Sequence, residues 1–388
     1  MKINFKDLTN EQFLAEYWQK KPLLIKGAFE QFNDPIEADE LAGLAMEEFI
    51  ESRIVSNPNK QWDVKHGPFA DFSEFGESDW TLLVQAVNHW FKGVDDLIEP
   101  FRFIPNWRID DVMVSFSTPG GGVGPHLDQY DVFIIQGSGK RRWRVGAPDA
   151  SLAELLPHED LKQVSDFNSV IDEITEPGDL LYIPPNHPHD GIAIDNSINY
   201  SIGFLAPSSQ ELLSGLADYN LDNNLNANRF DDSQRQVTNT PEQLTSTDID
   251  LLTKTLQQSL SDPKVVGDFL GKYLTTVHHT LNLLIPVEPL TIDFIKEILN
   301  DGEELEPVLG VKCILHTAQD DEAVLDNKNN RLFINGEVFA VDNESLDFAK
   351  LLASKNTLGI NVLKTHLDCL KNQQLLTTVI NKGLWSFE

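Results

Sequence analysis

Cysteine and long apolar runs, two features typical of secreted and membrane proteins, are scarce in this 388-residue sequence. Its two cysteines, Cys313 and Cys369, lack the CxxC spacing of redox and metal motifs. No apolar run approaches the roughly 18 residues that cross a bilayer, and the N-terminal MKINFKDLTNEQFL has no apolar signal-peptide core. These absences argue against a disulfide framework and a membrane span, so we expect a soluble, cytoplasmic protein without a membrane partner.

Basic residues are also few. The chain has 30 Lys and Arg against 61 Asp and Glu, which gives a formal net charge of −31 and a pI near 4.5. Proteins that bind nucleic acid directly need lysine and arginine to displace counterions from the phosphates, so we expect no nucleic-acid partner. A basic protein partner is favoured, although the acidity could also serve solubility alone.

Length and local pattern predict more than one domain. A chain of 388 residues exceeds the usual size of a single core. A helix at 10–20, a strand at 22–25 and a helix at 38–51 precede a β-rich region at 109–206. That region contains short runs separated by Gly and Pro turns, namely VMVSFS, DVFIIQG, RRWRVG, DLLYIPP and NYSIGF. Such a series predicts a β-sandwich or barrel.

The second half of the chain is more helical. A polar stretch at 220–248 indicates a loop between helical patterns at 210–219 and 249–284, which together predict a helical middle module. The elements that follow have the order of a winged helix: a helix at 291–300, a hairpin that turns at Asn335-Gly336, and helices at 345–353 and 360–371.

A possible metal site begins with the pair His126 and Asp128 in GGGVGPHLDQYDVFIIQG. Residues two apart on an extended strand point to the same side, so one metal could bind both. A second histidine would complete a 2-His-1-carboxylate triad, which leaves coordination positions open for a 2-oxo acid and O2. In EPGDLLYIPPNHPHDG, spacing alone cannot choose between His187 and His189. The return of the β pattern directly after His189 favours that residue.

A cation for the far carboxylate of a 2-oxo acid is predicted in RRWRVG, which follows one hairpin later. Trp143 and Val145 have the character of interior residues, and strand alternation places Arg141 on their inward face. The same alternation turns Lys140, Arg142 and Arg144 outward. Because a guanidinium can bind a carboxylate through two hydrogen bonds, Arg141 is the candidate clamp.

Other polar residues could complete this site. Ser115 and Ser117 share a face of the preceding strand and could donate hydroxyl hydrogen bonds to the same carboxylate, and Asn199 could do so near the metal. For each, a satisfied polar group of the core is an equally good interpretation. An acidic residue near the site, such as Asp131, could pair with a cationic substrate, but the sequence does not single one out.

The motifs together resemble a known family. The matching segments run nearly from end to end: FLAEYWQKKPLLIKG, WRIDDVMVSFSTPGGGVGPHLDQYDVFIIQGSGKRRWRVG, EPGDLLYIPPNHPHDG and GLWSFE. They resemble the JmjC-type ribosomal oxygenases, specifically the bacterial ribosomal-protein arginine hydroxylases of the cupin superfamily. Where relatives commonly carry PPGFPH, this chain has PPNHPH, so His187 would be an additional imidazole at the pocket rim.

The resemblance implies roles for individual residues. The family's iron ligands are matched by His126, Asp128 and His189. The residue that binds the C5 carboxylate of 2-oxoglutarate is matched by Arg141, and a serine that contacts this cosubstrate is best matched by Ser115. The resemblance therefore implies Fe(II), 2-oxoglutarate and O2 as cofactor and cosubstrates.

The resemblance also implies an α+β fold in three parts. These are a double-stranded β-helix (JmjC/cupin jelly roll) catalytic domain at 1–207, a helical dimerisation module at 208–286 and a winged-helix domain at 287–388. The implied reaction hydroxylates the β-carbon of an arginine in large-subunit ribosomal protein sixteen and releases succinate and CO2. The expected assembly is a homodimer, and the expected partner is that basic protein.

Two alternatives remain at this stage. The same iron centre would serve a JmjC hydroxylase or demethylase that acts on another protein. A non-catalytic cupin binding module is the alternative outside enzymes, but it would not need three intact ligands and an inward arginine.

Overall fold

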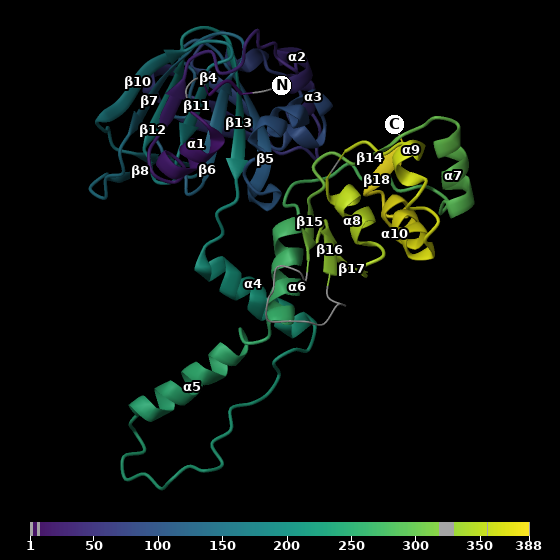
Figure 1. The fold of residues 1–388 in the computed structure, drawn as a ribbon. Helices are drawn as coiled ribbons and strands as arrows, with labels where there is room; N and C mark the ends of the chain where they lie inside the picture. Colours follow the sequence, from purple (N-terminus) through teal and green to yellow (C-terminus); the bar gives the residue numbers. More distant parts are fainter. Residues whose placement is uncertain (1–2, 6–7, 318–329, 355, 388) are drawn as a thin grey trace. The chain divides into compact units, whose positions relative to one another are not determined.

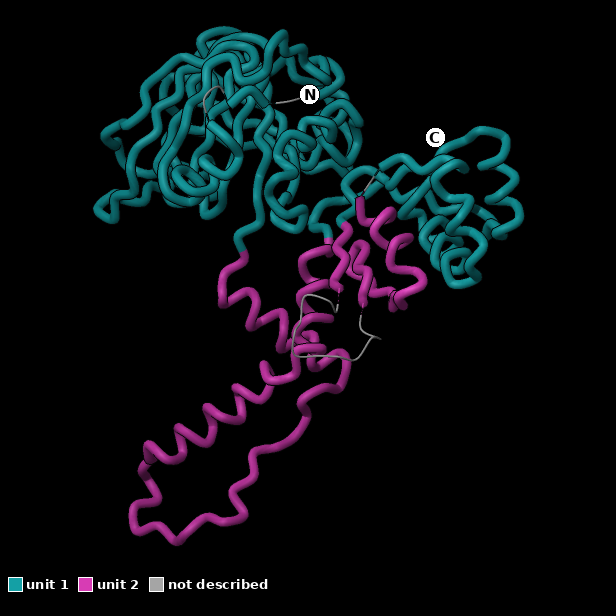
Figure 2. Tube along the Cα trace, viewed as in Figure 1, with its two compact units in different colours: residues 1–206, 277–312, 355–388 teal, residues 207–276, 313–354 magenta. Residues whose placement is uncertain are grey.

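The computed structural model, described for residues 3–5, 8–317, 330–354 and 356–387, divides into two compact units (Figure 1, Figure 2). Unit 1 comprises Met1–Ala206, Val277–Lys312 and Lys355–Glu388. Unit 2 comprises Pro207–Thr276 and Cys313–Ser354. None of the helices in the described ranges has both the length and the apolar character needed to cross a bilayer.

Unit 1 is built on two antiparallel sheets that form the expected jelly roll. The larger sheet has the strand order β1 (Leu23–Ile25), β11 (Leu180–Ile183), β6 (Asp131–Gln136), β13 (Ser197–Phe204), β5 (Ile109–Ser117), β4 (Trp80–Val84), β2 (Ser52–Ser56) and β3 (Asp63–His66). The smaller sheet has the order β10 (Ser169–Thr175), β7 (Arg141–Gly146) and β12 (His189–Ala193). A hairpin of β8 (Glu154–His158) and β9 (Leu161–Val164) stands beside them. The five runs expected from the sequence lie in β5, β6, β7, β11 and β13, so the prediction of the β region is confirmed.

Alternation along the strands divides the core into two clusters. Phe133 of β6 and Tyr182 of β11 point to one face of the large sheet, where Phe13 of helix α1 (Asn10–Glu16) packs on both rings. The neighbouring side chains point to the opposite face and meet the small sheet in one cluster: Val132, Ile134, Trp143, Val145, Leu181 and Ile183. The helices of the N-terminal part thus cover one face of the large sheet. The other face is left to line the interior between the sheets.

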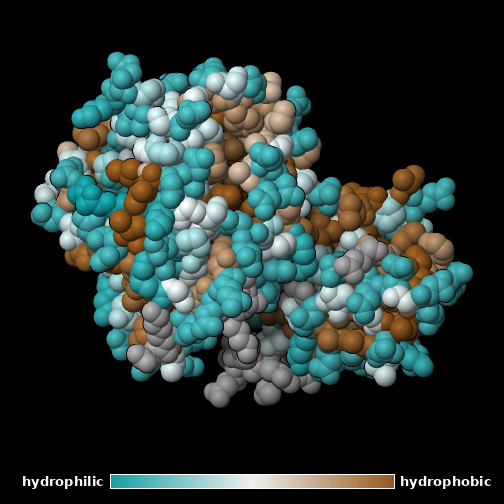
Figure 3. Space-filling view, turned by 90° about the horizontal axis from the view of Figure 1, so that it is seen from above, coloured by the Kyte–Doolittle hydropathy of each residue, from teal (hydrophilic) through white to brown (hydrophobic). Residues whose placement is uncertain are grey.

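The remaining elements of unit 1 are short. They are α2 (Ala38–Leu44), α3 (Lys92–Asp95), α7 (Ile292–Asn300), α9 (Ile360–Leu363) and α10 (Leu370–Asn381), with β14 (Leu305–Pro307) paired to β18 (Trp385–Phe387). On the face drawn in Figure 3, hydrophilic residues predominate and apolar ones occur in small groups. Most large apolar side chains are accordingly inside the units.

Unit 2 contains helices and a three-stranded sheet. Its elements are α4 (Ser209–Asp222), α5 (Ser246–Gln258), α6 (Pro263–Thr275), β15 (Cys313–His316), β16 (Asn330–Ile334), β17 (Glu337–Val341) and α8 (Leu346–Ala353). Asn335 and Gly336 have φ angles of 46° and 77° between β16 and β17, as a two-residue hairpin turn requires. The hairpin prediction is confirmed.

Four helix predictions were too long. The helix expected at 10–20 ends at Glu16. The helical pattern at 249–284 is two helices, because Asp262 caps a new start at Pro263, and it ends at Thr275, after which Thr276 is extended. The helix expected at 38–51 ends at Leu44. The one expected at 360–371 stops at Leu363 and a second helix begins at Leu370. In each case apolar spacing continued beyond the residues whose backbone is helical.

Candidate metal centre

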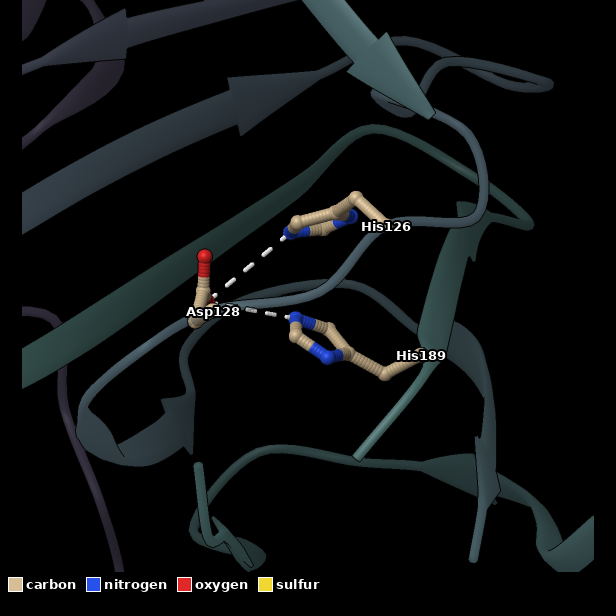
Figure 4. Close-up of side chains that lie close together, drawn as sticks. All are labelled: His126, Asp128 and His189. Carbon is tan, nitrogen blue, oxygen red and sulfur yellow. Dashed lines mark ion pairs between the residues drawn. The ribbon is translucent and has the colours of Figure 1, made fainter. Parts of the chain in front are cut away.

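The two sheets bring His126, Asp128 and His189 together (Figure 4). His126 follows a glycine-rich loop, and His189 begins β12. Their backbones form an antiparallel bridge with N···O distances of 3.0 Å in both directions. Asp128 Oδ2 lies 3.9 Å from His126 Nε2 and 3.4 Å from His189 Nε2, and each residue offers a ligand atom within 4.8 Å of the others. Two imidazole nitrogens and one carboxylate oxygen therefore converge on one point.

Hydrogen bonds to the backbone orient both imidazoles. His126 Nδ1 lies 2.9 Å from the carbonyl oxygen of Gly124, and His189 Nδ1 lies 2.9 Å from that of His187. A carbonyl oxygen only accepts hydrogen bonds, so Nδ1 carries the proton in each ring. Both Nε2 atoms face Asp128, and in a neutral ring each carries the lone pair that binds a metal. The donor set and the outer hydrogen bonds fit Fe(II).

Electrostatics favour the ligand form of two of these groups. Burial and, to a smaller extent, the charge of the nearby His189 lower the pKa of His126 to about 4. Burial alone would raise the pKa of Asp128, but the hydrogen bond from His189 and the charges of both histidines hold it at about 2. At neutral pH, therefore, the carboxylate is ionised and His126 is neutral, as metal binding requires.

His187 is not part of this cluster. Its Nδ1 lies 3.0 Å from the carbonyl oxygen of Pro185, and its side chain is buried. Because the backbone bridge to His126 starts at His189, the structure places His189, and not His187, opposite the other two residues.

Arg141 points inward, as alternation along β7 predicted. It is 5% exposed, and its guanidinium donates a hydrogen bond to the Ser117 hydroxyl, which lies 2.9 Å from Thr81 Oγ1. Its guanidinium carbon lies 5.7 Å from the ring centre of Trp143, which is 6.2 Å from that of His189. Trp143 is thus the side chain that separates Arg141 from His189 of the metal cluster.

The guanidinium of Arg141 is incompletely neutralised. Its Nε atom is buried without a hydrogen-bond partner, and no carboxylate of the described residues lies within 4.0 Å. Burial lowers its pKa to about 10, against the charge of Asp190, so it remains protonated at neutral pH. A buried cation without a counter-ion is costly to the fold, which fits a site for an anionic ligand.

The other predicted polar residues lie in one cross-strand row. Strand register pairs Ser115 with Asn199 and Asn199 with Gln136. Asn199 Nδ2 donates to Gln136 Oε1 at 3.0 Å, while Asn199 Oδ1 is buried without a partner among the described residues. Ser115 is buried. Of the two serines, Ser117 is the one that touches Arg141, and a contact of Ser115 with a cosubstrate stays a prediction.

Asp131 does not face this site. It is fully buried on the Phe133 face of β6, where Tyr182 donates to it at 2.6 Å and Arg108 at 3.1 Å. Asp111 and Tyr130 were missed. Asp111 lies on the Ser115 face of β5, which alternation along that strand could have revealed, and burial raises its pKa to about 6. Tyr130 lies close enough to Asp128 to contribute to its lowered pKa.

Comparisons with known proteins agree with this geometry. The JmjC domain family matches residues 96–212, and the ROXA-like winged helix family matches residues 256–386, which confirms the winged-helix prediction. The ribosomal protein uL16 3-hydroxylase of Escherichia coli K12 is 42% identical over 376 residues, 97% of each chain. A probable ribosomal oxygenase of Haemophilus influenzae is 37% identical over 230 residues, 58% of this chain and 57% of that one.

Solved structures give the same result. The E. coli ribosomal oxygenase YcfD in complex with cobalt and 2-oxoglutarate is 40% identical, with a TM-score of 0.88 and coverage of 100% of this chain and 99% of that one. Another structure of E. coli YcfD is 41% identical, with a TM-score of 0.90 and full coverage of both chains. With this similarity along its whole length and a matching JmjC domain, the protein belongs to the JmjC-type ribosomal oxygenases.

Proposed function

We propose that the protein is an Fe(II)- and 2-oxoglutarate-dependent oxygenase that hydroxylates the β-carbon of an arginine in ribosomal protein uL16. The observation that carries the proposal is the buried, charged guanidinium of Arg141, without a carboxylate within 4.0 Å in the described residues, beside a triad of two histidines and an aspartate. The relatives support it, since one is named as a uL16 3-hydroxylase and a neighbouring structure holds cobalt and 2-oxoglutarate.

In this proposal His126, Asp128 and His189 hold the iron. When bound, Fe(II) supplies activation of O2 for insertion of oxygen into a C–H bond, coupled to oxidation of 2-oxoglutarate to succinate and CO2. The protein's contribution is to fix where the metal and the organic acid lie. The backbone bridge between the two histidines sets the separation of their Nε2 atoms before any metal arrives.

Arg141 holds the distal carboxylate of 2-oxoglutarate. The guanidinium donates a hydrogen bond to Ser117, which in turn contacts Thr81. The Nε atom, which has no partner among the described residues, is then available to the carboxylate of the ligand. Ser115 and the buried Oδ1 of Asn199 lie in the adjoining row, where they contact the same molecule. Trp143 of the apolar cluster that joins the two sheets has its ring centre 5.7 Å from the guanidinium carbon, and apolar surroundings strengthen a charge interaction.

The target side chain is cationic. Asp111 lies on the same strand face as Ser115, and with Asp110 it acts electrostatically on Tyr130, which in turn acts on Asp128. Carboxylates at this edge suit a guanidinium. The net charge of −31 favours encounter with a basic ribosomal protein, and the proposal places the enzyme in the cytoplasm, where such a substrate is found.

Intact-mass analysis of uL16 tests this function. Incubation with the enzyme, Fe(II), ascorbate and 2-oxoglutarate is expected to add one oxygen, which fragmentation then places on one arginine. The control omits 2-oxoglutarate. Release of formaldehyde from a methylated protein, with no oxygen added to uL16, would identify a demethylase and overturn the proposal.

The proposed homodimer uses the helical module at 208–286, between a catalytic domain at 1–207 and a winged helix at 287–388. In unit 2, helix α5 has no buried residue. Along it and just beyond, Ile249, Leu252, Leu256 and Leu260 are 50%, 43%, 73% and 52% exposed at helical spacing. A second copy of the chain would cover this stripe.

Charge on the stripe is expected to dissociate the dimer. The double substitution Leu252→Glu and Leu256→Glu would bury two carboxylates in the interface, which costs several kcal/mol. Sedimentation at micromolar concentration should give a dimer for the wild type and a monomer for this variant. Lys254→Glu, on the opposite side of the helix, is the control and should stay dimeric. A wild-type protein that sediments only as a monomer would refute the dimer.

A further inference from the structure

Arg53 is a second arginine whose backbone position directs it to the site. It lies on β2, and the strand register pairs Arg53 with Leu83, Leu83 with Ser115, and Ser115 with Asn199. Residues paired in this way project from the same face of a sheet. Arg53 therefore starts from the face that carries Ser115 and Asn199, two strands away from Ser115.

The guanidinium of Arg53 has no hydrogen-bond or ion-pair partner among the described residues that would account for its burial. Its Nε atom is buried without a hydrogen bond, and among the described residues no carboxylate lies within 4.0 Å. By contrast, Arg142 and Arg144 of the small sheet each pair with an aspartate at 2.7 Å. The donors of Arg53 are available to a ligand.

Opposite charges stand around Tyr130. Arg53 interacts electrostatically with His126 and Tyr130, and Asp110 and Asp111 interact with Tyr130 as well. The guanidinium and these carboxylates therefore act on the same side of the site as the metal cluster. A polypeptide in this site meets both a cation and carboxylates.

We propose that Arg53 is a specificity-determining residue that binds an acceptor oxygen of the polypeptide substrate, a main-chain carbonyl or a carboxylate, beside the target residue. The inference rests on the proposed function. Arg141 already serves the cosubstrate, so a second cation has a different ligand. Arg53 also repels the cationic target side chain, which directs it towards Asp111 while the neighbouring acceptor oxygen binds Arg53. The substrate is thereby oriented by two contacts of opposite sign.

Steady-state kinetics with a uL16 peptide centred on the hydroxylated arginine tests the proposal. Arg53→Ala is expected to raise KM for the peptide about 10-fold to 100-fold, the range for a lost hydrogen bond to a charged group, with kcat lowered less than about 3-fold. Arg53→Lys should recover part of the affinity. Arg142→Ala, which removes an exposed arginine of the small sheet, is the matched control and should have the wild-type KM.

A second set of peptides identifies the oxygen. If the acceptor is a carboxylate, changing it to an amide removes the difference between wild type and Arg53→Ala; if the difference persists in every such peptide, the acceptor is a main-chain carbonyl. Either result supports the proposal. A wild-type peptide KM for Arg53→Ala, or a rise confined to the KM for 2-oxoglutarate, overturns it. Failure of the proposed function is distinct, because the wild-type enzyme itself would then leave the peptide unmodified.

Discussion

Replacing His189 by alanine is expected to reduce hydroxylation on the order of 1000-fold or more, because the metal would lose one of the three protein ligands that the proposed function assigns to it. The loss should appear first in metal binding. A titration with Co(II), followed by its visible absorption, should give a much weaker dissociation constant than for the wild type. The remaining pair, His126 and Asp128, would still bind the metal weakly, since Asp128 is ionised at neutral pH.

The neighbouring histidine provides the control for this result. His187→Phe introduces the aromatic residue that the sequence pattern of relatives has at this place, and the backbone carbonyl that accepts from His189 Nδ1 is retained. This variant should bind Co(II) and hydroxylate uL16 within a few-fold of the wild type. If both variants lost Co(II) binding and activity equally, activity would depend on the structure of the segment around residues 187–189 and not on His189 as a metal ligand.

Replacing Arg141 by methionine is expected to raise KM for 2-oxoglutarate by at least about 100-fold. A buried carboxylate that loses its charged partner forfeits 2–5 kcal/mol or more, of which about 3 kcal/mol corresponds to that factor. Methionine keeps much of the volume of the side chain and none of its charge. Measurement of succinate production over a wide range of 2-oxoglutarate concentrations gives the shift directly, and Arg142→Met, on the outward face, is the control.

The same variant separates binding from folding. Without ligand, Arg141 is a buried charge that lacks a carboxylate within 4.0 Å in the described chain. Its removal is therefore expected to leave the Tm of the ligand-free protein unchanged or higher, and to abolish the stabilisation by 2-oxoglutarate. A Tm several degrees lower, together with an unchanged KM for 2-oxoglutarate, would show that the arginine serves the fold instead.

The parts of the site that sequence predicts well depend on short-range geometry. His126 and Asp128 follow from the two-residue period of a strand, and the inward direction of Arg141 follows from the same period beside Trp143. The choice of His189 over His187 needed more, because it depends on a backbone bridge to His126, which is 63 residues away in the chain. No local pattern contains that pairing.

The environments of two acidic residues could not be predicted from the sequence. Asp131 and Asp111 both begin or lie near the beginning of a β-strand, and nothing local separates them. Asp131 is neutralised by Arg108 and Tyr182, which come from other parts of the chain. Asp111 lies on the Ser115 face of β5, where it accepts a hydrogen bond from Ala86 N–H at 2.9 Å and lies 3.8 Å from His279 Nε2. Their environments are fixed by strand order, which links β6 to β11 and β5 to β4. The predicted ends of several helices were wrong because capping residues such as Asp262, and not apolar spacing, determine where a helix begins or ends.

The pairing of β1 with β11 has a consequence for how the chain acquires its structure. Leu23 pairs with Tyr182, and Phe13 of helix α1 packs on that same tyrosine, so residues 13–25 dock on a strand that is synthesised about 160 residues later. The large sheet also needs β13 between β6 and β5. Contacts of such long sequence separation slow folding, because the intervening chain must first be closed into a loop. The large sheet therefore cannot be completed until Phe204 has been synthesised. Until then, the apolar side chains of the earlier segments remain exposed to solvent.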